Sequence, residues 1–144
     1  LEVAALLHEV GMYVNTSNHH KHSLYLIRNS DIFGLGTRDR EVAALVARYH
    51  RRAQPRMTHE GYASLSRERR LAVSKLAAII RVADALDRGH RQRTRNLEIA
   101  FDEGQIRLLV SGVPDLSIER LALEQKAELF EQIYGLHVVT RPLL

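Results

Sequence analysis

Apolar residues recur at helical spacing through the first two thirds of the chain. This period predicts helices over residues 1–10, 19–29, 38–50 and 68–88, with a short helical piece over residues 59–65. The longest segment, residues 68–88, carries apolar residues on more than one side. We therefore expect it to be a central helix that other elements contact from several directions.

The period changes from helical to alternating after residue 96. Residues 97–101 and 106–110 each alternate apolar and polar side chains, and an acidic turn with Gly104 separates them, which is typical of a β-hairpin. A further helix begins near Ser117 and ends at Gly135, and residues 136–140 form a last strand. The sequence thus predicts a mostly α fold, with a helical bundle over residues 1–94 and a small β-β-α-β module over residues 95–144.

Charge divides the chain at nearly the same place. Residues 1–95 hold 17 Lys and Arg against 9 Asp and Glu, a net charge of +8, whereas residues 96–144 hold 4 against 8, a net charge of −4. This asymmetry predicts a polyanionic partner for the first part, although a solvated basic face explains it equally well. The chain has no cysteine, which excludes disulfides and thiolate metal sites. Because no apolar run is long enough to cross a bilayer, we expect a cytoplasmic protein without a membrane partner.

Polar side chains interrupt the apolar faces of four predicted helices. These residues are His8 with its neighbour Glu9, His22, His50 and Asp84. Imidazoles and carboxylates that converge from several helices suit a divalent ion such as manganese, iron, cobalt, nickel, zinc or magnesium. Water on such an ion becomes a nucleophile for phosphate esters and anhydrides. The alternative is structural, in which each histidine donates to a backbone carbonyl and Asp84 pairs with Arg81 or Arg88.

Five ordered blocks of the sequence resemble one family. They are LLHEVG (6–11), HHKHS (19–23), YLIRNSD (25–31), VARYHRR (46–52) and LAAIIRVADALDR (76–88). These blocks are similar to the C-terminal half of the exopolyphosphatase and guanosine-pentaphosphate phosphatase (Ppx/GppA) family, and FEQIYG (130–135) resembles the last domain of that family. More distantly, the helical part resembles the HD phosphohydrolase superfamily, which implies an HD-like bundle.

The HD resemblance implies a role for each interrupting residue. His8 and Glu9 stand at the His-Asp position, with glutamate in place of aspartate, while His22 and His50 stand at further histidine positions and Asp84 at the terminal aspartate. The first histidine of the HD pattern would lie upstream, and we interpret the chain as part of a longer protein. Since a metal site built from these residues alone lacks that ligand, we expect no tightly bound divalent metal.

The family resemblance implies that hydrolysis takes place elsewhere. In the family, N-terminal actin-like domains use Mg²⁺ to cleave polyphosphate or guanosine pentaphosphate, and this chain has no glycine-rich phosphate motif. We therefore expect it to contain no catalytic residue and to supply homodimerisation and a basic channel for polyphosphate or another phosphorylated anion. The candidate phosphate contacts are Lys21, Arg51, Arg52, Arg81 and Arg88.

Two alternatives to this auxiliary role remain open. The chain is either a self-contained, metal-dependent HD phosphohydrolase or a purely structural dimerisation module whose basic face binds nothing. Nucleic acid is disfavoured as a partner, because aromatic residues make up only 6% of the chain and no base-stacking motif is present.

Overall fold

The computed structural model describes residues 1–143 and divides the chain into two compact units. The helical unit comprises Leu1–Ile80, and the sheet unit begins at Arg81. This division falls inside the long helix α5 (Arg67–Leu86), whereas the sequence placed the boundary after that helix, between residues 94 and 95. The physical reason is that the last turns of α5 carry Val82, Ala85 and Leu86, which belong to the hydrophobic core of the sheet unit.

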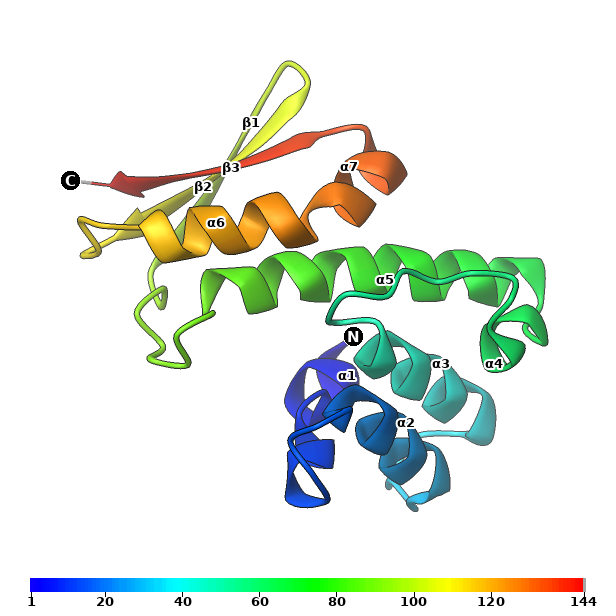
Figure 1. Cartoon of the computed structure of the whole chain (residues 1–144). Helices are drawn as coiled ribbons and strands as arrows, with labels where there is room; N and C mark the ends of the chain where they lie inside the picture. Colours follow the sequence, from blue (N-terminus) through cyan, green and yellow to red (C-terminus); the bar gives the residue numbers. More distant parts are fainter. Residues whose placement is uncertain (144) are drawn as a thin grey trace. The chain divides into compact units, whose positions relative to one another are not determined.

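The helical unit consists of short elements followed by the first part of α5 (Figure 1). In chain order they are α1 (Glu2–Leu7), the 3₁₀-helix η1 (Val10–Tyr13), α2 (His19–Asn29), α3 (Thr37–Arg48) and α4 (Glu60–Ala63). The sequence predicted α2 with both of its ends, and it predicted α4 too long. The first predicted helix, residues 1–10, is shorter than expected and continues as η1.

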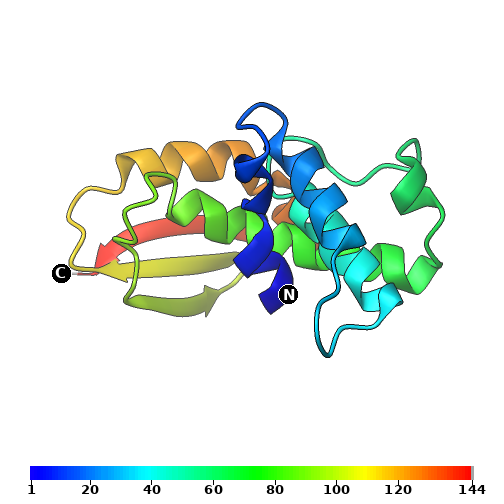
Figure 2. The same ribbon diagram turned by 90° about the horizontal axis from the view of Figure 1, so that it is seen from below.

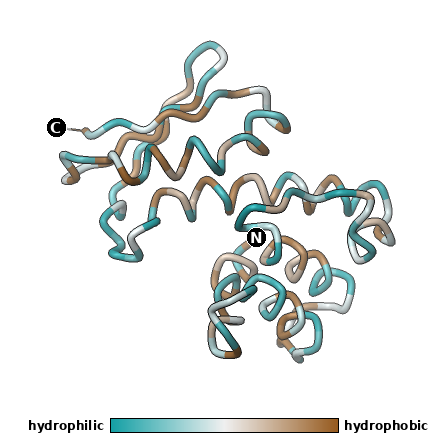
Figure 3. Tube along the Cα trace, in the orientation of Figure 1, coloured by the Kyte–Doolittle hydropathy of each residue, from teal (hydrophilic) through white to brown (hydrophobic). Residues whose placement is uncertain are grey.

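Helices α2 and α3 lie side by side and form the centre of the helical unit (Figure 1). Ile27 of α2 and Leu45 and Val46 of α3 are almost completely buried, and Figure 3 shows the hydrophobic middle of α3 in brown. Arg28 donates from Nε and Nη2 to the two carboxylate oxygens of Glu41, at 2.8 and 2.5 Å. Because such a two-pronged pair fixes both side chains, it holds the two helices in register.

The sheet unit contains three strands and two helices in addition to the end of α5. They are β1 (Leu97–Asp102), β2 (Gln105–Ser111), α6 (Ser117–Lys126), α7 (Glu128–Tyr134) and β3 (His137–Leu143). Strand β2 lies between the others, antiparallel to β1 and parallel to β3 (Figure 2). The prediction of a mostly α protein with a small β module is confirmed. The predicted single helix before β3 is wrong in one respect, because it is interrupted after Lys126.

One face of the sheet is only partly covered. Ile106 and Leu108 of β2 and Val138 of β3 are buried together with residues of α5 and α6. Leu97, Ile99 and Phe101 of β1 pair with apolar residues of β2 and so share their face, yet they are 37%, 55% and 69% exposed. The edge strand β1 therefore presents an apolar row to solvent. Among residues 1–143, no helix is both long and apolar enough to span a membrane.

Candidate functional site

Three histidines of the helical unit come together at the junction of α1, α2 and α3. The ring centroids of His8 and His50 are 4.9 Å apart in an edge-on arrangement, and those of His19 and His50 are 5.3 Å apart. The Nε2 atoms of His19 and His50 face each other at 3.3 Å. His50 is only 2% exposed and His19 9%. We call His8, His19 and His50 the histidine cluster.

Backbone carbonyls fix the orientation of all three rings. The Nδ1 atoms of His8, His19 and His50 lie 2.7, 3.1 and 2.6 Å from carbonyl oxygens three residues earlier, those of Ala5, Thr16 and Ala47. A carbonyl only accepts, so each Nδ1 carries the hydrogen that it donates. In a neutral imidazole the lone pair then resides on Nε2, which leaves that atom as the acceptor or ligand in each ring.

The segment after α1 is held closely against α2, which explains how His8 reaches the cluster. Ser23 of α2 donates from Oγ to the His8 carbonyl at 2.7 Å and accepts the N–H of Gly11 at 2.9 Å. A Cβ atom at Gly11 would lie 2.1 Å from the His19 carbonyl oxygen, so only glycine permits this approach. Ser23 and Gly11 thus set the position of His8 relative to His19.

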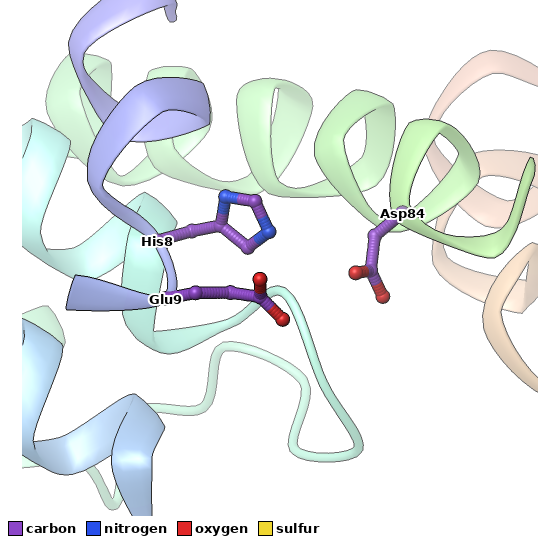
Figure 4. Close-up of side chains that lie close together, drawn as sticks. All are labelled: His8, Glu9 and Asp84. Carbon is purple, nitrogen blue, oxygen red and sulfur yellow. The ribbon is translucent and has the colours of Figure 1, made fainter. Parts of the chain in front are cut away.

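Glu9 lies next to the histidine cluster, since one of its carboxylate oxygens is within 4.8 Å of a ring nitrogen of His8. Figure 4 shows His8 and Glu9 at the end of α1 and Asp84 on α5. Asp84 belongs to the sheet unit, where its carboxylate forms an ion pair with the Lys126 ammonium. The sequence had offered only Arg81 or Arg88 as partners for this carboxylate. Lys126 was not considered because it lies 42 positions away in the chain.

His22 is the one predicted histidine that the structure does not bring to the cluster. Its side chain is half-buried on α2, and no hydrogen bond, ion pair or ring contact joins that side chain to another residue within 1–143. His19, one turn earlier on the same helix, takes the place that the sequence had given to His22. The only sequence signal for His19 is its membership of the run HHKHS, and that run does not distinguish between its three histidines.

The predicted phosphate contacts have different environments. Lys21 and Arg52 are exposed and Arg51 is half-buried, all in the helical unit, while Arg88 is exposed in the sheet unit. The prediction for Arg81 requires a correction, because this residue is only 2% exposed and donates from Nε to the Lys126 carbonyl at 3.1 Å. Burial lowers the pKa of Arg81, and the nearby Glu128 carboxylate opposes that shift. Its guanidinium therefore has a structural role within the sheet unit.

A basic corner surrounds His20 at the start of α2. Burial lowers the pKa of His20 to about 4, and the positive charges of Arg51, His19, Lys21 and Arg48 contribute further. Arg48, which the sequence did not single out, ends α3, and its Nε is buried without a hydrogen-bond partner within residues 1–143. We call His20, Lys21, Arg48 and Arg51 the basic corner.

The sheet unit has an open groove of about 1010 Å³ between α6, α7 and β3. Its charged lining includes Glu124, Glu128 and Glu131 together with Arg120 and Arg141. The carboxylates disfavour a polyanion in this groove.

Comparison with known proteins identifies the family. The model of Ppx/GppA phosphatase domain III matches residues 1–130, which is most of the chain. The chain belongs to the Ppx/GppA phosphatase family. A curated relative, the guanosine-5'-triphosphate,3'-diphosphate pyrophosphatase of Pseudoalteromonas translucida (strain TAC 125), is 35% identical over 51 residues, which is 35% of this chain and 10% of that protein. The match thus spans a tenth of the relative's length, and the resemblance seen in the sequence blocks is confirmed for domain III.

Proposed function

We propose that this Ppx/GppA domain binds phosphate-rich polyanions and self-associates, while phosphoanhydride hydrolysis, with Mg²⁺, belongs to other domains of the parent protein. The observation that carries the proposal is the basic corner. Lys21, Arg48 and Arg51 all lie close enough to His20 to act on its charge. These three cations come from the start of α2, from the end of α3 and from the segment that follows α3.

The unpaired Arg48 Nε supports an anionic ligand at the basic corner. A buried guanidinium N–H without an acceptor has lost water and gained nothing in return, which costs roughly 1–3 kcal/mol. A phosphate oxygen would supply the missing acceptor through a charge-assisted hydrogen bond. The first turn of α2 also contains no acidic residue that would compete with that anion.

The relative's name points to the same ligand chemistry. It describes a pyrophosphatase for a guanosine nucleotide that carries a 5'-triphosphate and a 3'-diphosphate, a compound dense in phosphate charge. Polyphosphate presents the same repeated charge on a flexible chain. Contacts to either ligand would be mainly electrostatic and therefore salt-sensitive.

Binding of long-chain polyphosphate, measured against salt concentration, tests this proposal. We expect Arg51→Gln to weaken binding about tenfold and to lower the slope of log affinity against log salt by about one unit. Arg38→Gln is the matched control, because Arg38 is exposed in the first turn of α3, whereas Arg48 lies in its last turn. Equal losses in the two variants, or equal affinity for orthophosphate at the same phosphate concentration, would contradict the proposal.

Self-association is supported by the exposed apolar row of β1. As an edge strand, β1 has one side of its backbone unpaired in the sheet, and a second copy can add there antiparallel. A two-fold axis at Ile99 would place Leu97 opposite Phe101 and Glu98 opposite Ala100 of the second copy. An axis at Ala100 would instead place Glu98 opposite Asp102, which is repulsive. Charge thus favours the Ile99 register.

The histidine cluster favours a second candidate function, a metal-dependent phosphohydrolase. The 144-residue chain, assayed with Mg²⁺, Mn²⁺ or Zn²⁺ on polyphosphate and on a generic phosphate ester, separates the two candidates. Under the first proposal we expect no turnover above the His50→Ala background. Turnover that His50→Ala abolishes would establish the second candidate.

A further inference from the structure

We infer that a small cavity of the sheet unit binds a single α-amino acid with an aliphatic side chain. The cavity has a volume of about 190 Å³ and lies between the first turn of α6 and the loop that joins α5 to β1. Its lining consists of Asp87, Gly89, Arg91, Arg93, Ile118 and Glu119. The inference goes beyond the proposed function, because every lining residue belongs to the sheet unit, whereas the basic corner belongs to the helical unit.

The first argument is the buried carboxylate of Glu119. This residue is only 4% exposed and shares the inward face of α6 with Leu116 and Leu123. Within residues 1–143, no hydrogen bond or ion pair joins the Glu119 side chain to another residue. The partial positive charge at the start of α6 favours a carboxylate there, but a buried carboxylate also needs hydrogen-bond donors. The ammonium group of a ligand in the cavity would supply those donors.

The second argument is that opposite charges line one cavity without pairing across it. Arg91 and Arg93 line the cavity, yet neither forms an ion pair with Glu119 in the described part of the chain. Asp87 adds a second carboxylate, whose Oδ1 accepts the backbone N–H of Gln92 at 2.8 Å. A ligand with charge of one sign would be repelled by one of the two pairs. A zwitterion satisfies both, because its ammonium can bind the carboxylates and its carboxylate the guanidinium groups.

The third argument is the size of the cavity and its apolar lining residue. A volume of about 190 Å³ equals the share of about six water molecules in the liquid, at about 30 Å³ each. Pockets for drug-sized ligands are larger, at about 300–1,000 Å³. A single amino acid is a zwitterion that suits the smaller volume. Ile118, which is 59% exposed at the cavity, offers an apolar contact to an aliphatic side chain.

Hydrogen bonds hold the loop that forms one wall of the cavity. The backbone N–H of His90 donates to the Asp87 carbonyl at 2.8 Å, and Thr94 Oγ1 donates to the Leu86 carbonyl at 3.2 Å. Together with the bond from Gln92 to Asp87, they tie the loop to the end of α5. Because this wall is already ordered, a small ligand has little ordering cost to overcome on binding.

Titration of the 144-residue chain with L-valine, followed through its amide NMR signals, tests the inference. We expect one equivalent to bind saturably, with a dissociation constant of about 1 mM or lower. L-Valinamide lacks the carboxylate, and N-acetyl-L-valine lacks the ammonium. Each should bind at least about tenfold more weakly, which is the effect expected when a charge-assisted hydrogen bond is lost.

Two substitutions assign the two halves of the ligand to their partners. Glu119→Gln should weaken valine binding at least about tenfold, because it removes the buried charge and keeps the shape of the side chain. Its matched control is Glu124→Gln, at an exposed position of α6 outside the cavity. Arg91→Gln should weaken the binding of valine but not of valinamide, which has no carboxylate for the guanidinium. Arg95→Gln is the control in the same loop, because Arg95 is exposed and does not line the cavity.

Three results would overturn the amino-acid site. They are the absence of saturable valine binding by the folded chain, equal affinities in Glu119→Gln and Glu124→Gln, and binding of valinamide or N-acetylvaline as tight as that of valine. The comparison of the three ligands uses the unchanged chain, so it decides the question even if Glu119→Gln does not fold. Polyphosphate binding by the unchanged chain separately tests the basic corner and does not depend on this result.

Discussion

Tyr49 and His59 form a hydrogen-bonded pair, and we expect its protonation to make the stability of the helical unit depend on pH. The Tyr49 hydroxyl lies 2.8 Å from His59 Nδ1, and the two rings stack with centroids 5.6 Å apart. Burial, followed by the charges of Arg48 and Arg56, lowers the pKa of His59 below its ordinary value of 6.5. Burial raises the pKa of Tyr49, while Arg48 opposes that shift, so the phenol keeps the hydrogen that it donates to neutral His59.

The sign of this pH dependence follows from proton linkage. Between the lowered pKa of His59 in the folded chain and 6.5 in the unfolded chain, the unfolded state binds more protons. The free energy of unfolding should therefore fall as pH decreases from 7 through this window, and His59→Gln should lessen that fall. Urea unfolding of both chains at pH 7.5 and 5.5 measures this fall in the free energy of unfolding. The control is His90→Gln, at an exposed histidine of the sheet unit, and an equal effect of both substitutions would contradict the prediction.

The histidines of the candidate site show which residues a sequence pattern can single out and which it cannot. The sequence predicted that His8 and His50 converge, because each interrupts an apolar face, and the structure places their ring centroids 4.9 Å apart. It selected His22 over His19, since two histidines one turn apart on a helix satisfy the same spacing. Which of the two histidines joins the histidine cluster depends on where α2 begins and on how closely Gly11 approaches α2. Both are determined by tertiary packing.

Gly11 controls the contact between η1 and α2, and Gly11→Ala tests that control. The added Cβ would lie 2.1 Å from the His19 carbonyl oxygen and 2.4 Å from the Ser23 nitrogen, so the two elements must separate. We expect the free energy of unfolding to fall by about 2–3 kcal/mol. Gly89→Ala is the control, because its Cβ would meet no atom closer than 3.8 Å, and chemical denaturation of the two variants should differ accordingly. Equal free energies of unfolding in the two variants would show that η1 moves away from α2 without loss of stability.

Elements that depend on local signals were predicted well, and elements that depend on distant contacts were not. The hairpin of β1 and β2 formed around Gly104, with φ +71°, and α7 ended at Gly135, with φ +67°, as the turn residues indicated. The interruption between α6 and α7 has no glycine or proline to mark it. The parallel pairing of β3 with β2 likewise has no local signal, because period-2 alternation does not specify a partner.

At the scale of the molecule, charge and hydropathy predict two modules, and the boundary they predict differs from the division into compact units. The loop between α5 and β1 is mostly polar, as its largely teal colour in Figure 3 shows, and the sequence predicted the end of the first module in this loop. Packing instead assigns the last turns of α5 to the sheet unit, because their apolar residues complete its core. Helix α5 thus contributes residues to the cores of both units. Its apolar residues keep one helical period throughout, so the sequence does not show where the core of the first unit ends.

The apolar row of β1 allows a test of the proposed self-association. If two copies pair through β1 in the register centred on Ile99, Ile99→Lys should convert the dimer to a monomer, because it places two cations side by side on the axis. Light scattering coupled to size-exclusion chromatography measures this. Ile118→Lys on α6, where Ile118 is 59% exposed, is the control and should leave the dimer intact.

The register itself can be tested by cross-linking, since the chain has no cysteine of its own. A chain with Leu97→Cys and Phe101→Cys should form an intermolecular disulfide under mild oxidation, because the two positions face each other across the axis at Ile99. Glu98→Cys with Phe101→Cys should not, because those side chains point to opposite faces of the sheet. A monomeric unchanged chain, or cross-linking that is equal in the two double variants, would exclude β1 as the interface.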